Sequence, residues 1–276
     1  MTTLTAEPAH TTSAAAVQVQ PVTQARVLSS EWIKMRSLRS TGLTLLAGLV
    51  AMVAVGWLVG WATNAHWSRM AADERARFSP IDSSLTGYHL AQLAVGVLGV
   101  LLISGEYATG MIRATFAAVP HRLPVLWAKA ALYAVVTFVL MLIAGFAAFL
   151  GGQQFLSSHG TTLSATHALR DVIGVAGYLT LIGVLAVALG FIIRSTAGGI
   201  ATLFGLLLVL PGIGQVLPTS WQLHTLPYLP SNAGASMFTE STDPGSLSAS
   251  GGLFVLCLWV VAGLIGAAVL VKRRDA

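Results

Sequence analysis

The sequence of residues 172–217, VIGVAGYLTLIGVLAVALGFIIRSTAGGIATLFGLLLVLPGIGQVL, decides the fold class of this chain. Its only charged residue is Arg194, which with Ser195 separates two apolar segments, residues 172–193 and 196–217. A helix of about 20 apolar residues crosses the hydrocarbon core of a bilayer. The stretch therefore predicts two membrane-spanning helices joined by a tight turn, and Pro211 should kink or end the second.

Further segments without Asp, Glu, Lys or Arg lie on either side of that pair. They are residues 41–63, 85–104, 130–150 and 251–271. Of the 276 residues in the chain, 55% are apolar and only 9% are charged, whereas soluble domains carry about 25% charged residues. We predict an all-α polytopic membrane protein with six transmembrane helices. In the first of them Gly56 and Gly60 form a GxxxG, which is typical of close packing within a chain or of dimerisation.

The N-terminal region differs from the rest of the chain. Residues 1–24 are rich in Thr, Ala, Gln and Val, without the basic start and apolar centre of a signal peptide, and predict a disordered cytoplasmic tail. Residues 25–276 are then expected to form a single transmembrane domain.

Residues 26–39, RVLSSEWIKMRSLR, predict an interfacial helix before the first span. Apolar side chains recur at helical spacing at Leu28, Trp32, Met35 and Leu38. Lys34 and Arg36 point away from this stripe, and Glu31 can pair with Lys34 one turn later. Trp32 suits headgroup depth. A soluble helix, or a simple flank of the first span, remains open as an alternative.

The distribution of Lys and Arg predicts the orientation. If the N-terminus is inside, the cytoplasmic side holds 11 basic residues: Arg26, Lys34, Arg36, Arg39, Arg113, Arg122, Lys129, Arg194, Lys272, Arg273 and Arg274. The outside holds 4, namely Arg69, Arg75, Arg77 and Arg170. The positive-inside rule then places both termini in the cytoplasm. Residues 218–250 fall outside, and their aromatic and proline content predicts short interfacial or re-entrant helices.

The sequence lacks the motifs of several kinds of enzyme and binding site. The only lysines are Lys34, Lys129 and Lys272, and none lies in a GxxxxGK[ST] loop that could hold ATP phosphates. There is no HExxH, paired-cysteine or GxSxG motif, and Cys257 is the only cysteine. The spans carry no carboxylate that could bind a coupling ion, and His89 is their only histidine. The basic residues flank spans, which argues against a nucleic-acid partner. We expect no cofactor in this chain and an external energy source.

The connection between the second and third spans is neither short nor simply polar. Residues 104–129 read SGEYATGMIRATFAAVPHRLPVLWAK, with helical character from Gly105 to Val119 and a turn bracketed by Pro120 and Pro124. An apolar helix that projects into the cytoplasm needs a surface to cover it. Its aromatic, Met and Arg content suits a docking anchor for a partner, and packing on the membrane or on this chain's own helices fits equally well.

Three stretches resemble the permease subunit of the ATP-binding-cassette type-2 family. They are EWIKMRS before the first span, residues 104–129, and YLPSNAGASMF at residues 228–238. Within the second stretch the family pattern is matched by Glu106, Gly110, Ile112, Arg113, Pro120, Arg122 and Lys129.

The resemblance implies a subunit with six spans that works as a dimer, with a second copy or a paralogue. It also implies two separate cytoplasmic ATPase subunits that bind the ATP and Mg, with no catalysis in this chain. The helix between spans two and three would be the coupling helix that docks on the ATPase. The docking residues it implies are Glu106, Tyr107, Met111, Ile112, Arg113, Phe116, His121 and Arg122.

Distinct roles follow for these residues under the resemblance. Met111, Ile112 and Phe116 would anchor the helix through apolar contacts. Arg113 and Arg122 would meet acidic residues at the rim of the ATPase, and Glu106 would pin the base of the helix, with a nearby arginine as one partner.

The leading hypothesis is therefore an ATP-driven exporter permease in the plasma membrane. A non-transporting sensor or immunity protein that uses the same scaffold is the alternative, and an associated ATPase would separate the two. An intramembrane enzyme or an ion-coupled carrier is disfavoured because the uncharged spans offer neither catalytic pairs nor ion ligands. The apolar spans favour an apolar or amphipathic substrate without identifying it.

Overall fold

The computed structural model describes residues 23–37, 39–119, 121–239 and 245–274. Over these ranges the regular structure is entirely helical, without a strand, which confirms the all-α prediction. Among these described residues, six helical units are long and apolar enough to cross a membrane, as the composition predicts. Residues 1–22, most of the predicted disordered tail, lie outside the described residues, and Gln24 already belongs to a helix.

The six spanning units follow one another in the predicted order. They are α2 (Arg39–His66), α4 (Pro80–Leu85) with α5 (Tyr88–Ala108), α7 (Leu123–Leu156), α8 (Ala168–Ile193), α9 (Thr196–Phe204) with η3 (Gly205–Val209) and α10 (Leu210–Gly214), and α13 (Ala249–Arg273). The sequence pattern placed the start of the third span directly after Lys129, but helix α7 already begins at Leu123. Pro124 lies in its first turn, a position where the missing N–H of proline is tolerated.

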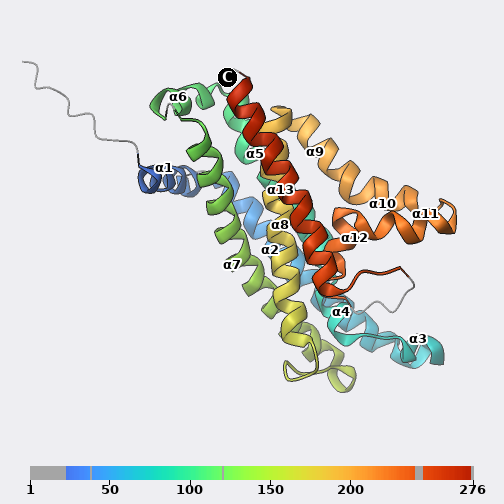
Figure 1. The fold of residues 1–276 in the computed structure, drawn as a ribbon. Helices are drawn as coiled ribbons and strands as arrows, with labels where there is room; N and C mark the ends of the chain where they lie inside the picture. Colours follow the sequence, from blue (N-terminus) through green and yellow to red (C-terminus); the bar gives the residue numbers. More distant parts are fainter. Residues whose placement is uncertain (1–22, 38, 120, 240–244, 275–276) are drawn as a thin grey trace, which may run out of the picture.

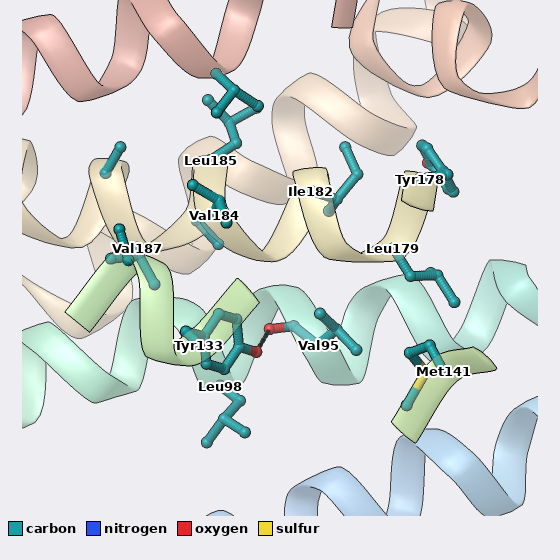
Figure 2. Close-up of a cluster of buried hydrophobic side chains, with 14 of the residues drawn as sticks. Val95, Leu98, Tyr133, Met141, Tyr178, Leu179, Ile182, Val184, Leu185 and Val187 are labelled. Atoms are coloured by element: carbon teal, nitrogen blue, oxygen red, sulfur yellow. Dashed lines mark hydrogen bonds between the residues drawn. The ribbon is translucent and has the colours of Figure 1, made fainter. Parts of the chain in front are cut away.

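Helix α8 occupies the centre of the bundle, between α5, α7 and α13 (Figure 1). In its most apolar 18-residue stretch 67% of the residues are buried, against 22% in the equivalent stretches of α2 and α13. Figure 2 shows the core that α8 forms with α5 and α7 around Leu98, Met141 and Ile182. The buried Tyr133 hydroxyl donates a hydrogen bond to the Val95 carbonyl at 2.5 Å, as a polar group without water requires.

The GxxxG of α2 is used for packing within the chain. A Cβ atom at Gly56 would lie 2.1 Å from the carbonyl oxygen of Ser84, and one at Gly60 would lie 2.8 Å from that of Gly152. Both glycines therefore allow the backbones of α4 and α7 to approach α2 more closely than any side chain would permit.

The fifth span is interrupted as Pro211 predicts. The π-helical turn η3 immediately precedes α10, and Pro211 stands in the first turn of α10. Proline cannot donate to the carbonyl one turn earlier, and a wider turn relieves the clash between its ring and that carbonyl. The helix then ends at Gly214, soon after the proline.

Short helices occupy the two ends of the bundle. At one end lie η1 (Trp67–Arg69), α3 (Ala72–Ala76) and η2 (Ser157–His159). The stretch after Pro218 forms α11 (Thr219–His224), η4 (Leu226–Tyr228) and α12 (Pro230–Ala235), which confirms the prediction of short helices there. At the opposite end from α3, α6 (Met111–Ala118) lies near the C-terminal end of α13, and α1 (Gln24–Ser37) lies to the side (Figure 1).

Candidate functional site

The stretch between α5 and α7, where the sequence predicts helical character, forms a separate helix, α6. Gly110 precedes it with φ +72°, in the left-handed region that favours glycine. This residue allows the chain to leave α5 and restart as a helix within two residues. Pro120, which the sequence pattern placed in the following turn, lies outside the described residues.

Helix α6 has one face packed on this chain and one face exposed. Ile112 and Phe116, four residues apart, are 2% and 8% exposed and belong to the core of the bundle. Met111 is 40% exposed, and Arg113 is also exposed. The resemblance gave Met111, Ile112 and Phe116 a common anchoring role, but of these three only Met111 is presented outward in this structure.

Four charged side chains from three helices form a cluster next to α6, and we call this cluster the charge quartet. Its members are Glu31 and Lys34 of α1, Glu106 of α5 and Lys129 of α7. Lys129 Nζ lies 2.5 Å from Glu31 Oε2 and 2.7 Å from Glu106 Oε1. Lys34 Nζ lies 2.7 Å from Glu31 Oε1 and 3.4 Å from Glu106 Oε1, and donates to the Thr115 hydroxyl of α6 at 3.1 Å.

The charges of the quartet balance, which is why they can be buried together. The side chains of Lys129, Glu31 and Glu106 are 1%, 3% and 7% exposed. Burial of a single charge is unfavourable by several kcal/mol, and opposite charges with good hydrogen bonds offset that cost. At Lys34, burial acts to lower the pKa, but the hydrogen bond to Glu31 and the charges of Glu106 and Glu31 outweigh it, so its pKa is raised. Lys34 is therefore a cation at neutral pH.

The sequence analysis gave roles to three members of the quartet, Glu31, Lys34 and Glu106, and these roles are only partly correct. The structure confirms the Glu31–Lys34 pair. Glu106 does lie at the base of α6, but its partners in the quartet are lysines rather than an arginine. The sequence analysis included Lys129 in the family pattern but gave it no structural role. The fold shows that its ammonium donates to both Glu31 and Glu106.

The buried face of α1 also differs from the predicted stripe. Val27, Glu31 and Met35 are its buried residues, whereas Trp32 is 46% exposed. Of the predicted apolar stripe, Met35 is buried and Leu28 packs partly buried against the core. The buried face of α1 therefore follows the stripe in part and also includes Glu31 with its ion partners. Arg36 is exposed as predicted, and Leu38 lies outside the described residues.

Two arginines connect this end of the bundle to the end of α13. The Arg122 guanidinium lies 5.3 Å from the centre of the Phe116 ring and donates to the Arg274 carbonyl at 2.9 Å. Arg194, at the turn between α8 and α9, stacks over Tyr107 at 4.9 Å and donates to the Leu270 carbonyl at 3.5 Å. Both cations thus approach the carbonyl-rich C-terminal end of a helix, where positive charge is favourable. His121, between α6 and α7, is exposed.

Hydrogen bonds and ring contacts join α6 and its flanking turn to several helices of the bundle. Within the described residues no group of His, Cys, Asp or Glu is placed to hold a metal ion. The buried carboxylates of the quartet are engaged by lysines. Lys34 joins α6 to the quartet through Thr115. Arg122, which lies over the Phe116 ring, reaches the C-terminal end of α13.

Comparison with known proteins agrees with this interpretation. No curated protein matches the chain significantly. Residues 27–212 match the family described as ABC-2 family transporter protein, a range that includes most of α1, all of α6 and the charge quartet. Because the match covers more than half of the chain, this protein belongs to the ABC-2 transporter family and is a membrane component of an ABC transporter.

Proposed function

We propose that the chain is the permease subunit of an ATP-driven exporter in the plasma membrane, with both termini in the cytoplasm. It forms the translocation path together with a second copy or a paralogue. A separate ATPase subunit, which binds ATP and Mg, docks on the exposed face of α6. The catalytic step of ATP hydrolysis then belongs entirely to that partner.

The observation that carries this proposal is the division of α6 into two faces. Ile112 and Phe116 fix the helix to the bundle, while Met111 and Arg113 are left for a partner. Met and Arg are both residue types enriched at protein interfaces, and α6 exposes one of each. ATP can shift the permease between two conformations only through contacts that differ between them, and α6 is well placed to carry such contacts.

The docking role is tested by the double substitution Met111→Ala and Arg113→Ala. Both side chains are exposed, so thermal stability should stay within about 0.5 kcal/mol of the wild type. Recovery of the ATPase by affinity purification should fall at least about ten-fold, as expected when interface anchors are removed. Trp221→Ala, an exposed site on α11, is the matched control and should retain the ATPase.

Unchanged recovery of the ATPase with the double variant would contradict docking on α6. If the wild-type chain itself recovers no ATPase, the alternative of a partner-binding sensor or immunity protein replaces the permease. Phe116 is unsuitable for this test because its removal would also open the core.

The proposed orientation has its own test in cells. In a Cys257→Ala background, Ser157→Cys should react with an impermeant thiol reagent added outside, and Ser37→Cys should react only after lysis. Both positions are exposed, so accessibility reports the side of the membrane. The reverse pattern would overturn the orientation.

A further inference from the structure

A cavity of about 390 Å³ lies beside the charge quartet, between α1, α2, α5 and α6, and we call it the α1–α5 cavity. Its polar end contains Lys34, Glu106 and Lys129, with the hydroxyl residues Ser40, Thr41 and Thr44 near the start of α2. Its apolar wall includes Leu98, Leu101 and Leu102 of α5. Leu101 of α5 is 38% exposed, so the cavity reaches the outer surface of the bundle.

Glu106, which lines the polar end of the cavity, has one carboxylate oxygen without a hydrogen-bond partner in the described part of the chain. Oε1 of Glu106 accepts from Lys129 and Lys34, while its Oε2 atom is buried and has no hydrogen-bond partner within the described residues. The Glu106 side chain is 7% exposed. A carboxylate oxygen that is removed from water without a donor is unfavourable, so a bound group with an N–H or O–H would stabilise it.

The charge balance of the quartet limits the net charge of a group that can bind there. The quartet is already neutral, with two lysines and two glutamates. A ligand with a net charge would disturb this balance, whereas a zwitterion can place its cation near Glu106 and its anion near Lys34. The Lys34 side chain is 29% exposed and lines the cavity, so its ammonium can be approached.

We propose that the α1–α5 cavity binds a phosphatidylethanolamine molecule from the leaflet on the α1 side of the bundle. The ethanolamine ammonium donates to Glu106, the phosphate lies near Lys34, and one acyl chain follows Leu98, Leu101 and Leu102 towards the bilayer. The cavity volume suits the headgroup and the first part of a chain, with the remainder in the surrounding lipid. Met111, an exposed residue of α6, also lines this cavity, but binding of the lipid does not depend on an ATPase partner.

The headgroup chemistry distinguishes phosphatidylethanolamine from other common phospholipids. The choline headgroup has the same charges as ethanolamine but no N–H, so it cannot donate to Glu106. A phosphatidylglycerol headgroup adds a net negative charge beside a buried carboxylate, which is unfavourable. The site should therefore select by hydrogen bonding and charge balance, rather than by acyl chain.

The test is native mass spectrometry of the protein extracted from vesicles with equal amounts of phosphatidylethanolamine, phosphatidylcholine and phosphatidylglycerol. The wild type should retain phosphatidylethanolamine about ten-fold over phosphatidylcholine, as expected for one charge-assisted hydrogen bond. Leu101→Trp fills the cavity without touching the quartet and should abolish the preference. Val139→Trp, on the exposed face of α7 and away from the cavity, should keep it.

A second variant tests the chemistry of the headgroup directly. Glu106→Gln should lose the preference for ethanolamine over choline if it folds, and Leu101→Trp keeps the proposal testable if it does not. Equal retention of the zwitterionic lipids by the wild type, or an unchanged preference in Leu101→Trp, would overturn the site. Displacement of the lipid by soluble phosphoethanolamine would overturn the assignment to a membrane lipid in favour of the free headgroup.

Discussion

The two ends of the bundle are held together by different chemistry. At the end that carries α6, helices α1, α5 and α7 are tied by the charge quartet. At the opposite end, neutral hydrogen bonds tie α7 to α4. Gln153 of α7 donates to the Pro80 carbonyl and to the Ser84 hydroxyl of α4, each at 2.8 Å. Rings of Tyr88, Tyr178 and Phe238 pack edge-on and tilted against one another.

This difference indicates which end is built to respond to a partner. Each neutral hydrogen bond or ring contact contributes about 1 kcal/mol to the free energy of unfolding. This contribution changes little when a neighbouring contact is altered. A buried ion network is favourable only while it is complete, because one missing partner leaves an uncompensated charge. The end with α6 therefore has few acceptable arrangements, and a docking partner that shifts α6 acts on all of the helices tied there.

The largest effect is expected from Lys129→Met. This substitution leaves Glu31 and Glu106 buried with Lys34 as their remaining quartet partner, and breaking a buried pair costs about 3–5 kcal/mol. The thermal unfolding midpoint in detergent, followed by size-exclusion fluorescence, should drop strongly. Adding Glu106→Gln to the same chain removes one buried negative charge and should recover a large part of the loss. Equal stability of Lys129→Met and wild type would contradict the ionic account.

A smaller effect is expected from Gln153→Leu at the opposite end. The substitution removes the bonds to Pro80 and Ser84 and the one accepted from the Thr161 backbone N–H, but it leaves no buried charge. The expected loss is about 1–3 kcal/mol, measured by the same unfolding assay. A loss equal to that of Lys129→Met would remove the distinction between the two ends.

The smallest effect concerns the pH dependence that Lys34 contributes. Its folded-state pKa is raised above the value in the unfolded chain, about 10.4, so the folded state holds this proton more tightly. The stabilisation is complete below the unfolded pKa and is lost as the pH rises through the folded pKa. The difference in unfolding midpoint between wild type and Lys34→Met should be constant from about pH 6 to about pH 9 and shrink only above that range. A difference that changes near neutrality would contradict the assignment.

The sequence predicted the spans well because membrane insertion depends on a local property, the length of an uncharged stretch. The turn at Arg194 and the break of the fifth span at Pro211 were predictable for the same reason, because each residue affects only the backbone close to it. The separate helix α6 was also recognisable, because Gly105 to Val119 retains helical character.

The quartet could not be derived from sequence alone. Lys129 and Glu31 are 98 residues apart, and their contact depends on how α1 packs against α7. A lysine in front of an apolar segment normally marks the membrane boundary, so its burial inside the helix was not expected. The burial of Ile112 and Phe116 was likewise undetermined, because an amphipathic helix does not reveal whether its apolar face meets its own chain or a partner.

The central claim is that the exposed face of α6 contacts an ATPase, and a photo-crosslinking amino acid at Met111 tests it most directly. The same group at Trp221, which is also exposed, serves as the control. After irradiation in the native host, the account predicts a crosslinked product at Met111 that contains a protein with a GxxxxGK[ST] motif, and no such product at Trp221. Crosslinks from Met111 only to lipid or to this chain itself, with the ATPase absent, would contradict the claim.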